Sequence, residues 1–135
     1  MPSPILSTKK AAEQRLATLG IPTAYENAEF TPVANQVYLR VQFQIQNPDD
    51  PVRGDKYYRE RIQLQVFICD LLNKGTASAI DTAETIRTLF AKGTFITQDG
   101  YRISVLSTPS IKGSVKTQDR LVVPLMIDLT TEVYN

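Results

Sequence analysis

Apolar and polar residues alternate along two segments of the chain. Over residues 38–46, every second side chain from Leu39 is apolar, and the positions between them carry arginine or glutamine from Arg40 onward. Residues 57–69 show the same alternation from Arg61. A period of two is typical of a β-strand with one buried face, so we predict a strand in each segment.

The two alternating segments are separated by the loop 47–56, NPDDPVRGDK, which contains two prolines and one glycine. These residues favour turns, because proline fixes φ and glycine tolerates a left-handed backbone. We therefore predict that the two strands form an antiparallel hairpin with a long loop.

Two other segments place apolar residues at helical spacing. Residues 3–19 carry them along one side of a helical wheel, and Gly20 with the proline at position 22 provides a stop signal. Residues 75–93 form the second predicted helix, which Thr76 or Ser78 caps and whose early acidic residues suit the helix dipole.

A tight hairpin is predicted after the second helix. Residues 94–97 and 101–107 are short strand-like segments, and Asp99-Gly100 lies between them. An Asp-Gly pair suits a two-residue turn, because both of its residues tolerate positive φ.

Two more strands are predicted, and both contain or adjoin proline. Residues 121–134 alternate as a strand, and Pro124 inside them predicts an edge strand or a bulge, since proline donates no ladder hydrogen bond. Residues 23–30 can run as a short strand bracketed by Pro22 and Pro32, which places it at a sheet margin.

The order of elements predicts an α+β fold. Helix, strands, helix and strands follow one another, which favours a two-layer sandwich: a mostly antiparallel β-sheet with two helices packed on one face. The 135 residues are about the length of one domain, and we expect a single domain over residues 1–135.

Composition and charge exclude several classes of protein. The chain has 15 basic and 14 acidic residues and no concentrated basic segment, so tight binding of nucleic acid is not expected. No apolar run approaches the roughly 20 residues of a membrane span. The N-terminal residues lack the pattern of a secretory signal, so we expect a soluble, non-exported protein.

The sequence contains no candidate catalytic, cofactor-binding or metal-binding site. Histidine is absent, and Cys69 is the only cysteine; it ends an apolar strand, where a buried structural thiol is expected. The adjacent acids Asp49 and Asp50 are too common a loop pattern to indicate a cation site. A metal nuclease needs converging carboxylates, whereas the two alternating strands present glutamines.

Polar side chains of the two alternating strands share one face of the predicted sheet, and Gln46 continues the row. This face has two interpretations: an ordinary solvated surface, or a contact or channel surface whose neutral amides bond a partner without burying charge. We call it the glutamine face, and its members are Arg40, Gln42, Gln44, Arg61, Gln63 and Gln65.

Several motifs follow one another in a fixed order: P-x-A-Y-E-N with F-x-P downstream, YLRV, a helix that begins GTASA and ends L-F-x-x-G, a TFITQDG hairpin and a hydrophobic last strand. In these motifs and their order, residues 21–134 resemble the tail terminator (tail completion) proteins of long-tailed bacteriophages.

This resemblance implies a structural protein of the virion and no enzyme. Such proteins form hexameric rings that cap the tail tube, stop its polymerisation and offer a docking surface for the head. The partners implied are further copies of the chain, the tail tube protein and a head-completion or connector protein. DNA would pass through the ring without specific binding. The implied location is the head-proximal end of the tail, after assembly in the cytoplasm of the bacterial host.

The resemblance also suggests which residues make contacts. We expect the margin segment, residues 23–30, and the long loop to supply a subunit or tube interface, because a free strand edge can pair with another chain. The candidates are Tyr25, Glu26, Asn27, Phe30, Arg53, Asp55 and Lys56. The glutamine face is the candidate contact or lumen face.

Three other interpretations of the whole chain are kept beside this one, and one of them is a nucleic-acid-binding module. A phage neck or head-completion adaptor would share the topology and the virion location. A small ligand-binding or enzymatic α+β domain would instead be a compact monomer at every concentration, with a deep pocket that binds a small molecule.

Overall fold

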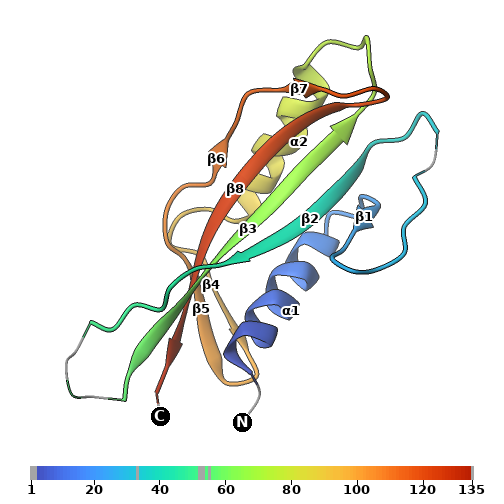
Figure 1. Cartoon of the computed structure of the whole chain (residues 1–135). Coiled ribbons are helices and arrows are strands. Elements are labelled where there is room, and N and C mark those ends of the chain that lie inside the picture. Colours follow the sequence, from blue (N-terminus) through green and yellow to red (C-terminus); the bar gives the residue numbers. More distant parts are fainter. Residues whose placement is uncertain (1–2, 33, 52–53, 55, 135) are drawn as a thin grey trace.

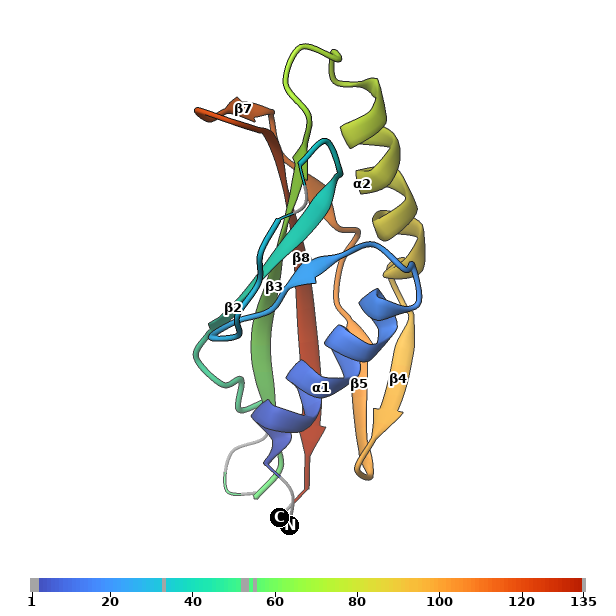
Figure 2. The ribbon, with the colours of Figure 1, turned by 90° about the vertical axis from the view of Figure 1, so that its right-hand side faces the viewer.

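The computed structural model describes residues 3–32, 34–51, 54 and 56–134. In this part of the chain, eight strands form one curled, mostly antiparallel sheet, and two helices pack against it. Figures 1 and 2 show the helices together on one side of the sheet, with the start of α1 and the end of β8 at the same end of the molecule. The predicted α+β architecture is confirmed.

The helix α1 spans Pro4–Ala17 and begins as its sequence suggests. The Ser3 side chain accepts a hydrogen bond from the Leu6 N–H at 3.3 Å, which caps the first turn. α1 buries mostly small side chains, which lets its axis lie close to the sheet. They are Ser7, Thr8, Ala11, Ala12 and Leu16.

The helix α2 spans Ala77–Leu89, and it buries Ala79, Ala83 and Ile86. Thr76 occupies the N-cap position, as one of the two predicted alternatives, but its side chain makes no capping hydrogen bond. Ile80, which the apolar stripe of the sequence includes, remains 40% exposed.

The two long strands β3 and β8 form the centre of the sheet, whose order is β1-β2-β3-β8-β5-β4. β1 and β2 are parallel, and the other pairs are antiparallel. Short strands β6 and β7 also pair with β8. The strands are β1 (Thr23–Ala24), β2 (Tyr38–Ile45), β3 (Tyr58–Asp70), β4 (Phe95–Gln98), β5 (Tyr101–Val105), β6 (Ser110–Ile111), β7 (Val115–Lys116) and β8 (Leu121–Val133).

The β4–β5 hairpin closes as the sequence predicts. Asp99 and Gly100 form its two-residue turn with φ values of 54° and 83°. Two successive positive φ values are the signature of a type I′ turn, which matches the twist of the flanking strands.

The strand predicted over residues 23–30 is wrong in its length, although its position at the sheet margin is confirmed. Only Thr23–Ala24 pairs, with Leu39 and Arg40 of β2. The chain then turns, and Asn27 adopts a left-handed backbone with φ of 51°, which ends the extended run.

The expectation that the last strand lies at an edge or bulges at Pro124 is also wrong. β8 has neighbours on both sides, and its register with β3 is unbroken from Val133 to Leu121. The Pro124 carbonyl accepts a hydrogen bond from the Lys112 N–H at 2.8 Å, between β6 and β7. In an antiparallel strand, N and C=O of one residue point to the same side, so the missing N–H of proline is not needed by β3.

The core lies between the helices and one face of the sheet. Alternate residues of β2, β3 and β8 contact buried residues of both helices there. This confirms the prediction that the apolar side chains of the alternating strands lie on one buried face of the sheet. The hydroxyls of Thr8 and Thr131 hydrogen-bond each other inside this layer and join α1 to β8. The apolar face of β2 is not wholly covered: Ile45, near the end of the strand, is 55% exposed.

Candidate functional site

The glutamine face is a real surface of the folded chain. β2 and β3 pair so that Gln42 lies opposite Gln65 and Gln44 lies opposite Gln63. The alternate residues of both strands face the helices, so these polar side chains project from the opposite side of the sheet. The structure thus brings together all six residues that the sequence assigns to this face.

The amides of the glutamine face hydrogen-bond one another across β2 and β3, and the row extends to a carboxylate of β8. The Gln65 Nε2 donates to Gln44 Oε1 at 3.0 Å and to Gln63 Oε1 at 2.9 Å. The Gln63 Nε2 then donates to Asp128 Oδ1 at 3.3 Å, and the Ser107 hydroxyl donates to the same carboxylate at 3.4 Å. These contacts hold the amides in place, which lowers the entropy cost of binding a partner here.

Sequence reasoning did not include Asp128 in this face. The signal was present, because Asp128 has the parity opposite to the buried residues of β8 and therefore projects on the open side. Which strand lies next to β3 is a matter of topology, so the pairing of Gln63 with Asp128 could not be predicted.

The two arginines of the glutamine face differ in their surroundings. The Arg40 guanidinium lies over the Phe67 ring, 4.6 Å from its centroid, which is a cation–π geometry. Arg61 is exposed, and among the described residues it has no ion-pair partner. Its charge is available to a binding partner.

The margin segment adjoins the glutamine face. An open hollow of about 830 Å³ lies between them, and Tyr25, Glu26 and Asn27 line it together with residues of β2 and β3. Phe30 does not line this hollow; its ring packs on Tyr38, with centroids 5.2 Å apart. Three of the four predicted margin residues are therefore brought together with the glutamine face, and the fourth is elsewhere.

Glu26 occupies a structural position at this margin. Its carboxylate accepts a hydrogen bond from the Phe43 N–H at 3.0 Å and forms an ion pair with Lys9 of α1 at 2.7 Å. Burial raises the pKa of Glu26, but the contacts with Lys9 and the Phe43 N–H outweigh it, so the pKa lies below the ordinary 4.5. The anion is the form that joins α1 to β2.

The long loop is held at its base. Asp49 and Arg59 exchange backbone hydrogen bonds of 2.8 and 2.9 Å, and their side chains form an ion pair of 2.9 Å. Lys56 is exposed, whereas Arg53 and Asp55 lie outside the described residues.

The described residues contain no group of three or more metal-ligating side chains. Cys69 is buried, as predicted, and burial raises the pKa of its thiol, which disfavours the reactive thiolate. Neither described helix combines the length and the apolar character needed to cross a membrane.

Comparisons with known proteins agree with this description. A family model described as phage tail terminator protein matches residues 7–128. A solved structure that shares 24% sequence identity superposes with a TM-score of 0.78 over 94% of each chain, which shows a common fold. No curated protein matches the sequence.

Proposed function

Because this chain belongs to the phage tail terminator protein family, we propose that it ends growth of the tail tube by closing into a hexameric ring on the tube's last ring. The family is structural and non-enzymatic, and its members are components of the phage tail. The same ring would present the surface on which the head docks through its completion or connector protein.

The two sides of the sheet differ in what covers them, and this difference supports a ring. Helices cover one side of the sheet, and no element of the described chain covers the glutamine face. A closed cyclic assembly needs two different, complementary patches on each subunit, and a fold with unlike sides supplies them. The preordered amides can hydrogen-bond a partner at a low entropy cost.

The margin and the loop are proposed as further contacts. The edge strand β1 is followed directly by Tyr25, Glu26 and Asn27. A neighbouring subunit or the tube can reach these residues at the edge of the sheet. The loop 47–56 starts from a fixed base at Asp49 and carries Arg53, Asp55 and Lys56, which we assign to tube contact. The nearly balanced charge of the chain is compatible with DNA passing the ring without strong attachment.

Light scattering and native mass spectrometry over a concentration series test the proposed ring. The measured mass should rise from one subunit to six as the protein concentration increases. When tail tubes of the same phage are added, the rise should occur at a lower protein concentration, because a partner that binds only the ring favours ring closure. A single subunit at every concentration, with and without tubes, would refute the ring.

A further inference from the structure

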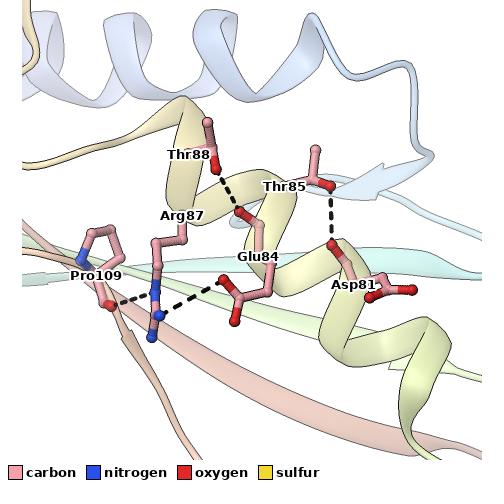
Figure 3. A network of polar contacts seen from close by, with 6 residues as sticks. All are labelled: Asp81, Glu84, Thr85, Arg87, Thr88 and Pro109. Carbon is pink, nitrogen blue, oxygen red and sulfur yellow. Dashed lines mark hydrogen bonds and ion pairs between the residues drawn. The ribbon is translucent and has the colours of Figure 1, made fainter.

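The exposed side of α2 accepts hydrogen bonds and offers few donors. The hydroxyl of Thr85 donates to the Asp81 carbonyl and that of Thr88 to the Glu84 carbonyl, each at 3.0 Å (Figure 3). A hydroxyl has one proton, so these threonines present only lone pairs to the outside. We call Asp81, Glu84, Thr85 and Thr88 the acceptor face; all four residues are exposed.

Arg87 balances only part of the charge of this face. The Arg87 Nε donates to the Pro109 carbonyl at 3.2 Å, and its ion pair with Glu84 is long, at 3.7 Å (Figure 3). Asp81 has no ion-pair partner within the described residues. A partner for the acceptor face must therefore bring donors and positive charge.

The glutamine face carries the matching groups. Arg61 is exposed and forms no ion pair with an acid of the described chain, and Arg40 keeps its guanidinium on the surface over Phe67. A guanidinium has five N–H donors and no acceptor, the complement of carboxylates and of hydroxyl lone pairs.

Each face also has apolar surface. Ile80 is 40% exposed beside the acceptor face, one turn before Glu84. On the open side of the sheet, Phe67, Pro124 and Met126 occupy neighbouring rows and are only partly buried. Contacts between proteins commonly combine an apolar centre with a charged, hydrogen-bonded rim.

The two faces are back to back on one subunit. α2 packs on β3 and β8, and β3 carries Arg61, Gln63 and Gln65 on its other side. A surface and its complement on opposite sides of the same layer cannot meet within one chain. They can meet between copies, in a head-to-tail contact that closes into a ring when the rotation allows it.

We propose that the acceptor face of one subunit binds the glutamine face of the next copy of this chain, with Asp81 and Glu84 facing Arg61 and Arg40. This inference rests on the proposed ring and assigns its subunit contact. A second copy is the partner assigned, because every copy of the chain carries both halves of the contact: carboxylates and hydroxyl lone pairs on α2, and guanidinium donors at Arg61 and Arg40.

Two charge-reversed variants, Arg61→Asp and Asp81→Arg, test the contact. Each alone places like charges on both faces, so the concentration needed for half-assembly should rise about tenfold or more. An equal mixture should assemble like the unmodified chain, because every contact in a ring of alternating variants again joins an acid to an arginine. Native mass spectrometry resolves the alternating composition, and tail tubes are added if the unmodified chain needs them.

Lys10→Asp is the matched control, since Lys10 is exposed on α1 away from both faces, and thermal unfolding verifies that each variant folds. Normal assembly of either single variant would overturn the proposed contact. This holds even if the rings of Arg61→Asp then fail to pass DNA, because the ring would have formed without the contact. Failure of the mixture to assemble also overturns it. If the unmodified chain forms no ring with or without tubes, the proposed function itself fails, which is a distinct result.

Discussion

The carboxylate of Glu26 accepts a hydrogen bond from the backbone N–H of Phe43, so a side chain completes the sheet margin where β1 ends. In a longer β1, a backbone carbonyl would satisfy this donor. The ion pair of Glu26 with Lys9 adds α1 to the same connection. This arrangement fixes the position of the segment that lines the hollow beside the glutamine face.

Replacing Glu26 by alanine should lower the free energy of unfolding by about 1.5–3 kcal/mol, the usual scale for losing a hydrogen bond to a charged group. Lys9→Ala is the matched control, and it should cost less, about 0–1 kcal/mol, because a partly exposed ion pair contributes little. Urea unfolding of the two variants measures both quantities. Equal losses would show that the Phe43 hydrogen bond has no separate role.

The lowered pKa of Glu26 also predicts a pH dependence. Its contribution to stability is fully present above the ordinary pKa of 4.5 and is lost as pH falls through the lower pKa of the folded state. The difference in unfolding free energy between the unmodified chain and Glu26→Gln should therefore shrink over the acid interval that begins below the ordinary pKa of 4.5. A difference that stays constant over this interval would contradict the assigned ionic contacts.

Pro124 should be replaceable at little cost, although it lies in a central strand. Pro124→Val should lower the unfolding free energy by no more than about 1 kcal/mol, mainly by giving the unfolded chain more freedom. The neighbouring Leu125→Ala, in the core, should cost about 2–5 kcal/mol. A larger loss for Pro124→Val than for Leu125→Ala, measured by the same unfolding titration, would contradict the described orientation of Pro124.

The long loop should act in attachment and not in folding. Alanine at Arg53, Asp55 and Lys56 should change the unfolding free energy by less than about 0.5 kcal/mol, because the Asp49–Arg59 base of the loop stays intact. Co-sedimentation with tails should then fail. Normal attachment of this triple variant would remove the loop from the tube contact.

Local patterns in the sequence determine much of this fold. The alternation of Leu39 with Arg40, and its repeat beyond Arg61, predicts two strands and the face on which each side chain lies, because the strand period is fixed by backbone geometry. Asp99-Gly100 predicts its hairpin for a similar reason: the turn is determined by two residues.

The errors arise where distant segments decide the outcome. Proline predicts an edge position if each residue of a central strand must donate and accept hydrogen bonds with a regular neighbouring strand. On the side of β8 away from β3, the pairing is interrupted between β6 and β7, so the N–H that Pro124 lacks is not required there. The margin strand ends early where the chain turns at Asn27, and there the Glu26 side chain takes the place of strand pairing by accepting the Phe43 N–H. The place of Asp128 in the glutamine face depends on β8 lying beside β3, which no local pattern specifies.

Electron microscopy of phage particles made without this protein tests its role as a tail terminator most directly. The account predicts tails of abnormal length that are not joined to heads, and restoration of normal particles when the protein is supplied. Tails of normal length joined to filled heads in its absence would contradict the account.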